Sequence, residues 1–214
     1  MDDVAVPASL RTLLTAAVAR ELASAYSDEV VFPDRIVVDH PGDPDSGFPE
    51  WPAPVLVISI ENQGVCRWGV PLDRPDPLVL VGGELFDGSD WAEGTVAYAP
   101  DVAHFIAARR WDGDCLSGKP LLQAQAAELA AGTLGYLRAH FTELLPTRGF
   151  PGRDQFRFER RGVKVMLWSG PGQCDWWISG TDADELRGAV GELTSLADLR
   201  DSLWSDDPVG DLLR

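Results

Sequence analysis

The sequence predicts an α+β fold: a mixed or mainly antiparallel sheet with helices packed on one face. Two observations support this class. Apolar residues recur at helical spacing near the start of the chain and again late in it, and short β-branched or alternating runs lie between them. The chain has 214 residues, 45% of them apolar, which is enough for a sizeable core. We expect two lobes, residues 1–115 and 116–214, joined near residues 111–118. One continuous domain is the alternative.

The first lobe should begin with an amphipathic helix, for which Ser9 is a suitable N-cap. The apolar run Val55–Ile60 then predicts a strand buried on both faces. In chain order we expect a helix at 10–25, extended segments at 30–32 and 35–38, a loop rich in Pro, Gly and Asp at 40–52, strands at 55–60, 65–70 and 78–81, an acidic loop at 82–93, a strand at 95–98 and a helix from 100 to about 110.

A turn joins the first two central strands. Its sequence is Glu61-Asn62-Gln63-Gly64, and such a tight turn favours positive φ at Asn62 or Gly64. We therefore interpret these residues as structural.

This turn and its surroundings resemble the core of the SUKH superfamily (Smi/Knr-like proteins). The resembling residues are Glu61-Asn62-Gln63-Gly64-Val65-Cys66-Arg67-Trp68-Gly69-Val70, then Asp76-Pro77 before an apolar strand, and Phe105-Ile106 in a helix. The resemblance covers about residues 30–112 and implies a SUKH-like core for the first lobe. Many bacterial members act as immunity proteins that bind and neutralise a cognate toxin. The resemblance therefore implies a protein-binding role without catalysis.

The charge of the chain is acidic and uneven. Its net charge is −16, which argues against a nucleic-acid binder because phosphate neutralisation needs clustered Lys and Arg. Residues 28–101 hold 15 acidic and 3 basic residues, whereas residues 148–164 hold 6 basic and 2 acidic ones. An acidic surface can attract a basic partner such as a nuclease toxin, or it can simply keep the protein soluble.

Candidates for a partner-binding surface are acidic residues in two expected surface loops and in the segment between them. They are Asp39, Asp43, Asp45, Glu50, Asp73, Asp76, Glu84, Asp87, Asp90 and Glu93. If the sheet brings these loops to one edge, their fields add. Charge density is the basis of this expectation, and the family resemblance supports it.

The second lobe should contain a long helix, a meander and a C-terminal helix. Pro120 suits the first turn of a helix over residues 120–141. Residues 155–160 alternate strictly, 163–168 return and 174–179 follow, which predicts three antiparallel strands. Thr181 and Asp184 resemble a capping box at the start of the next helix, and a last helical segment should cover about 195–204.

The sequence contains no recognisable catalytic, cofactor or metal motif. Cys66, Cys115 and Cys174 are odd in number and form no CxxC pair, so we expect reduced thiols, with Cys66 and Cys174 mostly buried. Cys66 with His104 is one conceivable pairing of nucleophile and base, but an apolar strand would raise the pKa of the thiol.

No run approaches 18 apolar residues, and the first residues are acidic where a signal peptide would be basic. We therefore expect a cytoplasmic protein that binds neither membrane nor nucleic acid. A cytoplasmic regulatory or scaffolding module that binds another protein is the alternative function. A small enzyme of unfamiliar type is a third.

Overall fold

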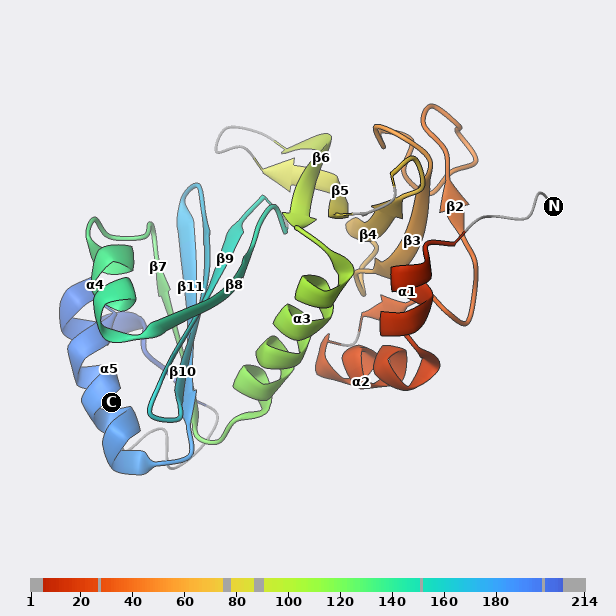
Figure 1. The fold of residues 1–214 in the computed structure, drawn as a ribbon. Coiled ribbons are helices and arrows are strands. Elements are labelled where there is room, and N and C mark those ends of the chain that lie inside the picture. Colours follow the sequence, from red (N-terminus) through yellow and green to blue (C-terminus); the bar gives the residue numbers. More distant parts are fainter. Residues whose placement is uncertain are drawn as a thin grey trace. The chain divides into compact units, whose positions relative to one another are not determined.

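The computed structural model describes residues 6–26, 28–74, 78–86, 91–150, 152–197 and 199–205 (Figure 1). Helices alternate with antiparallel sheets, so the predicted α+β class is confirmed. Contacts within the chain divide it into two compact units. Unit 1 is Met1–Arg110 with Thr147–Gly152, and unit 2 is Trp111–Pro146 with Arg153–Arg214.

Unit 1 is built on a six-stranded sheet of order β1-β3-β4-β5-β6, with β2 also paired to β3. All of its pairings are antiparallel. Its elements are α1 (Ala8–Leu13), α2 (Ala16–Tyr26), β1 (Glu29–Val30), β2 (Val38–Asp39), β3 (Val55–Ile60), β4 (Cys66–Pro71), β5 (Val79–Phe86), β6 (Trp91–Ala99) and the first part of α3 (Val102–Ser117).

The central strand β3 has the predicted bounds, and its first five residues are buried. β-branched side chains pack well on both faces of an interior strand, which is why this run forms one. The turn that follows contains Gly64 at φ +77°, and the N–H of Gly64 donates to the carbonyl of Glu61 at 2.8 Å. The predicted positive φ is confirmed.

The two faces of this sheet are covered by different segments. On one face, Trp68 lies 4.9 Å from Phe150 between ring centroids, and Tyr98 lies 6.0 Å from Phe105 of α3. On the other face a Cβ added at Gly82 would fall 2.6 Å from the ring of Phe48. The loop before β3 therefore packs closely on β5.

Two predicted boundaries in unit 1 were wrong. The single helix expected over residues 10–25 is interrupted between α1 and α2, where the Thr15 hydroxyl accepts a hydrogen bond from the N–H of Val18 at 3.4 Å. Thr15 thus acts as an N-cap that begins a second helix. The acidic loop expected over residues 82–93 is largely strand, because β5 continues to Phe86 and β6 starts at Trp91.

Unit 2 is built on a five-stranded sheet of order β7-β11-β10-β9-β8. The predicted meander is confirmed, since β9 pairs with β10 and β10 with β11, both antiparallel. Its elements are the end of α3, β7 (Leu121–Ala126), α4 (Thr133–His140), β8 (Thr142–Thr147), β9 (Asp154–Arg160), β10 (Val163–Gly170), β11 (Gln173–Gly180), α5 (Ala183–Ala197) and the 3-10 helix η1 (Arg200–Ser202).

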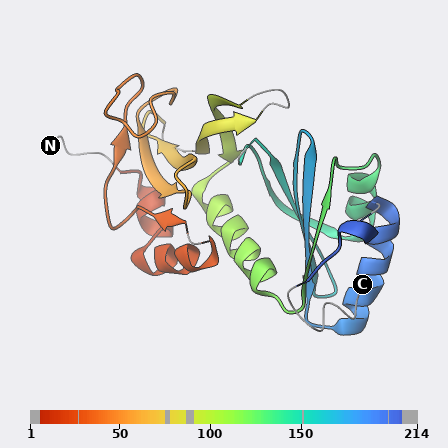
Figure 2. The same ribbon diagram turned by 180° about the vertical axis from the view of Figure 1, so that it is seen from behind.

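The main core of unit 2 lies between one sheet face and the helices α4 and α5 (Figure 1). Leu137 of α4 and Leu193 of α5 are fully buried against Trp176 of β11 and its neighbours. Past η1 the chain runs beside β7, where Gln123 and Trp204 exchange backbone hydrogen bonds of 2.9 Å (Figure 2).

The other sheet face of unit 2 receives the end of α3. Arg157 of β9 is fully buried, and its guanidinium donates to both carboxylate oxygens of Asp112 at 2.5 and 2.6 Å. Beside this pair, Met166 packs with Trp111 and Cys115. The hinge expected at residues 111–118 is therefore mostly helix.

The long helix predicted over residues 120–141 is also wrong. Its first part is β7, which pairs with β11 and alternates in burial, with Leu122 and Ala124 inward. Only Thr133–His140 is helical, and the strand β8, which follows directly, was not predicted. The last helical segment, expected over 195–204, is reduced to the end of α5 and η1.

Candidate functional site

Asp39 was expected on a surface loop but is buried, so its predicted location was wrong. It is 2% exposed, and its carboxylate accepts hydrogen bonds from the indole N–H of Trp51 at 3.1 Å and the backbone N–H of Gly47 at 3.2 Å. Arg67 lies 3.6 Å away as its cation. Asp39 therefore fixes the loop before β3 and is not available to a partner.

The loop at 40–52 is held by its own hydrogen bonds. Asp43 accepts a bond from the N–H of Asp45 at 2.9 Å, and the hydroxyl of Ser46 accepts one from the N–H of His40 at 2.7 Å. Asp side chains commonly stabilise turns by accepting such hydrogen bonds from the backbone two residues further on. Asp43 is half-buried, whereas Asp45 is exposed.

Glu84 and Glu93 face each other directly across β5 and β6. Both are exposed, and neither has a salt-bridge partner within the described part of the chain. Directly opposed like charges on an antiparallel pair are unfavourable. The register thus places two carboxylates at directly opposed positions of the sheet, where like charges repel.

Glu50 lies beside this pair. Its carbonyl accepts a hydrogen bond from the hydroxyl of Thr95 at 3.1 Å. Thr95 and Glu93 are two residues apart on β6, so their side chains share a face about 7 Å apart along the strand. The structure therefore places the main chain of Glu50, from the first candidate loop, next to the face of β6 that carries Glu93, and Glu93 is paired with Glu84. We call these three residues the acidic triplet.

The other candidates do not join the acidic triplet. Asp73 is exposed and, among the described residues, forms a salt bridge with its neighbour Arg74 at 3.4 Å. It follows β4, whose end lies beside the start of β5, whereas Glu84 lies near the end of β5. Asp76, Asp87 and Asp90 fall outside the described residues.

Buried polar groups hold the turn that carries the family resemblance. The carboxylate of Asp28 accepts a hydrogen bond from the N–H of Asn62 at 3.2 Å and pairs with Arg109 of α3. The Arg109 guanidinium lies 4.5 Å from the centroid of the Trp68 ring. Burial raises the pKa of Asp28, and Arg109 opposes that shift. This network ties the turn to the helix, so its charged groups serve the fold.

All three cysteines are buried thiols, which confirms the predicted burial of Cys66 and Cys174. Burial raises the pKa of Cys66 far above the usual thiol range, that of Cys115 to about 12 and that of Cys174 to about 11. Thiols with such values remain protonated near neutral pH and are weak nucleophiles.

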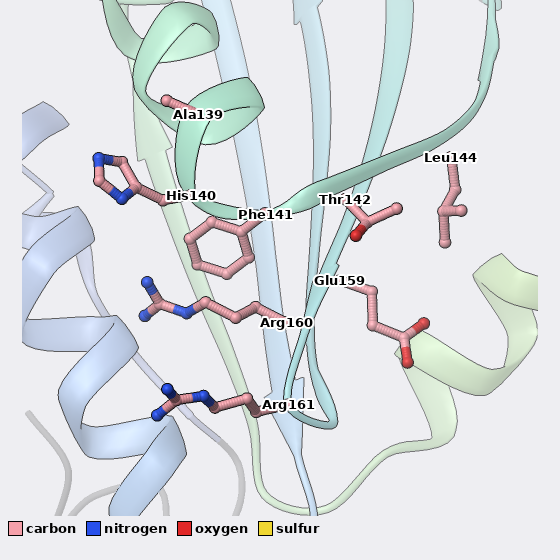
Figure 3. Close-up of a pocket in the computed structure, with 8 residues that line it drawn as sticks. All are labelled: Ala139, His140, Phe141, Thr142, Leu144, Glu159, Arg160 and Arg161. Carbon is pink, nitrogen blue, oxygen red and sulfur yellow. The ribbon is translucent and has the colours of Figure 1, made fainter.

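A surface hollow of about 650 Å³ lies in unit 2 (Figure 3). The residues that line it are Ala139, His140, Phe141, Thr142, Leu144, Glu159, Arg160 and Arg161. The basic stretch 148–164 was visible in the sequence. The remaining lining was missed because a long helix was expected where α4 ends and β8 begins.

Among the described residues, no group of three or more His, Cys, Asp and Glu side chains is arranged to hold a metal ion, and no helix is long and apolar enough to cross a bilayer.

Fold and surface together define a two-unit α+β protein with an acidic triplet on one unit and a basic hollow on the other. Comparisons of the chain with protein-family models, with curated proteins and with solved structures found no match. The resemblance to the SUKH superfamily therefore rests on the quoted residues alone.

Proposed function

We propose that the chain is a non-catalytic, cytoplasmic immunity protein that binds and neutralises a bacterial toxin with a basic surface, such as a nuclease. The proposal joins the SUKH-like residues at 61–70 to the acidic triplet. The observation that carries it is the opposition of Glu84 and Glu93 across β5 and β6. A cationic side chain placed between the two carboxylates would turn their repulsion into attraction.

Protection of a sheet edge is the competing explanation for these charges. β6 is the edge strand, and a charged residue such as Glu93 discourages pairing with another chain. Glu84, however, lies on β5, an inner strand that pairs with β4 through Leu80–Gly83, directly before Glu84, and with β6 at Glu84 itself. Edge protection needs a charge on β6 alone, whereas binding of a basic partner uses both carboxylates.

The polar groups of the SUKH-like region support a binding role over catalysis. Asp28 and Arg109 pair with each other inside unit 1, and the thiol of Cys66 is 1% exposed. These groups stabilise the fold. The carboxylates of Glu84 and Glu93, in contrast, are exposed and accessible to a partner.

The experiment begins with capture of the partner from the native organism, followed by mass spectrometry. Its association rate is then measured with the wild-type chain, with Glu84→Gln/Glu93→Gln, and with Glu128→Gln/Asp154→Asn, which removes the same charge from exposed positions of unit 2. We expect slower association with the first variant only. The wild-type rate should fall as salt shortens the Debye length from about 10 Å to about 3 Å.

Two results would overturn the proposal. A captured partner that does not harm cells when expressed alone would favour a regulatory or scaffolding module. A toxic partner that associates equally fast with all three proteins would show that the acidic triplet is not part of the interface.

A further inference from the structure

The hollow in unit 2 has chemically different walls (Figure 3). His140, Arg160 and Arg161 extend toward one side of β9, and Glu159 extends toward the other. Glu159 is held there by the indole N–H of Trp111, which donates to it at 3.3 Å. The carboxylate that lines the hollow therefore does not neutralise the basic wall.

The guanidinium of Arg160 is held in place by its neighbours, and these contacts do not use all of its N–H donors. Its guanidinium lies 4.2 Å from the centroid of the Phe141 ring and donates to Glu192 at 2.9 Å, while Glu192 also accepts from the hydroxyl of Tyr136 at 2.9 Å. A guanidinium has five N–H donors, so one bond to Glu192 leaves most of them available. The hydroxyl of Tyr136 is a second polar neighbour of this guanidinium.

Arg161 occupies a position that disfavours arginine. Arg160 pairs with Val163, so Arg161 and Gly162 form a two-residue turn, with φ of +48° and +78°. Positive φ at both positions favours Asn, Asp or Gly. An arginine there is strained, and strained residues concentrate at functional sites. Its side chain is 74% exposed and pairs with Glu185 at 3.2 Å. An incoming anion can displace such an exposed pair at little cost.

We propose that this basic wall binds the phosphate or carboxylate group of a small molecule. Guanidinium groups match the planar or tetrahedral oxygens of these anions with parallel N–H donors, and the imidazole of His140 adds a third donor. A volume of about 650 Å³ is in the range of small-molecule sites. The inference concerns unit 2 and does not depend on the protein-binding role proposed for unit 1.

The test uses the full-length chain in chloride buffer of constant ionic strength. Inorganic phosphate and acetate are titrated separately, and backbone amide NMR shifts are followed. We expect saturable shifts centred on residues 140–142 and 159–162 with at least one anion, and the anion that binds identifies the class. Absence of saturable shifts with either anion at millimolar concentration would overturn the proposal.

Variants separate this site from general charge effects. Arg161→Asn removes the cation while placing a favoured residue in the turn, so folding should be preserved and anion affinity should fall at least tenfold. Arg160→Gln should cause a similar loss. Arg187→Gln is the matched control, since Arg187 pairs with Asp184 on α5 at 2.7 Å and does not line the hollow. Equal affinity in Arg161→Asn and wild type, or equal loss in Arg187→Gln, would overturn the proposal.

Discussion

Phe150 and Trp68 pack together in unit 1, with their ring centroids 4.9 Å apart. Phe150 belongs to the segment Thr147–Gly152, which is part of unit 1 although the chain on both sides of it is part of unit 2. The segment is fixed by a hydrogen bond from the N–H of Arg148 to the carbonyl of Tyr98 at 3.2 Å. A lobe that ends at residue 115 would therefore lack part of its own core.

Phe150→Ala should destabilise the protein by about 3 to 5 kcal/mol, because it leaves a cavity beside the fully buried Trp68. Urea unfolding followed by circular dichroism measures the effect. Ile36→Ala, at a position that is 55% exposed, is the control and should change stability by less than about 0.5 kcal/mol. An unfolding midpoint in Phe150→Ala equal to that of the control would contradict the role of this contact.

Gly64→Val should destabilise by about 1 to 3 kcal/mol, since a β-branched residue is strained at positive φ. Space is not the cause, because nothing lies within 4 Å of a Cβ built at Gly64. Gly188→Ala is the matched substitution on an exposed turn of α5, also with open space, and should stabilise by about 0.5 to 1 kcal/mol. Chemical denaturation distinguishes the two, and a shift of the same sign in both would refute the backbone argument.

Arg109→Met should destabilise by about 3 to 5 kcal/mol at pH 7, because Asp28 is left buried without its cation. The loss should be smaller near pH 4. Burial raises the pKa of Asp28 in the folded protein above its unfolded value of 3.8. The buried carboxyl therefore stabilises the fold when it is protonated, below pH 3.8, and this stabilisation is lost as pH rises through the folded-state pKa. Without Arg109 the folded-state pKa rises further, which widens this window.

The control for this prediction is the double variant Asp28→Asn/Arg109→Met, which removes both members of the buried pair. Its stability relative to wild type should vary less between pH 4 and pH 7 than that of Arg109→Met. Equal pH dependence in the single and double variants would show that Asp28 is not the responsible carboxyl.

The cysteine thiols should react slowly with Ellman's reagent in the folded protein at pH 8. Burial raises the pKa of Cys115 to about 12 and that of Cys174 to about 11, so little thiolate is present. In urea all 3 cysteines of the chain should react quickly. Rapid reaction of any thiol without denaturant would mean that it is more accessible than the structure shows.

Glu84→Gln/Glu93→Gln should stabilise the isolated protein by roughly 0.2 to 1 kcal/mol, because it removes two directly opposed charges. The gain should shrink at high salt, where the repulsion is already screened. Thermal unfolding at low and high salt measures it. A loss of stability in low salt would mean that these carboxylates have stabilising partners.

The sequence was most informative where local pattern and tertiary environment agree. Val55–Ile60 is apolar throughout and lies inside a sheet, and residues 155–179 alternate in a meander, so both predictions hold. Pairing between distant segments explains the main failure. The side chains of β7 suit a helix as well as a strand, and hydrogen bonding to β11 decides between them.

The candidate surface also depends on pairing between distant segments, which the sequence pattern does not reveal. Acidic residues could be counted along the chain, but register alone places Glu84 opposite Glu93 and a single Thr95 hydrogen bond places Glu50 beside them. Asp39 was misplaced because its partners, Trp51 and Arg67, lie on other segments. The hollow depends on the junction of α4 and β8, which the expected long helix concealed.

The late origin of Thr147–Gly152 also bears on how the protein is made. Translation at roughly 5 to 20 residues per second needs about 2 to 8 seconds to pass from residue 111 to residue 150. Throughout that interval the synthesised chain contains the residues of the unit 1 sheet and the start of α3 but lacks the aromatic ring that packs against Trp68. We therefore expect the nascent chain to complete its first core only after most of the polypeptide has left the ribosome.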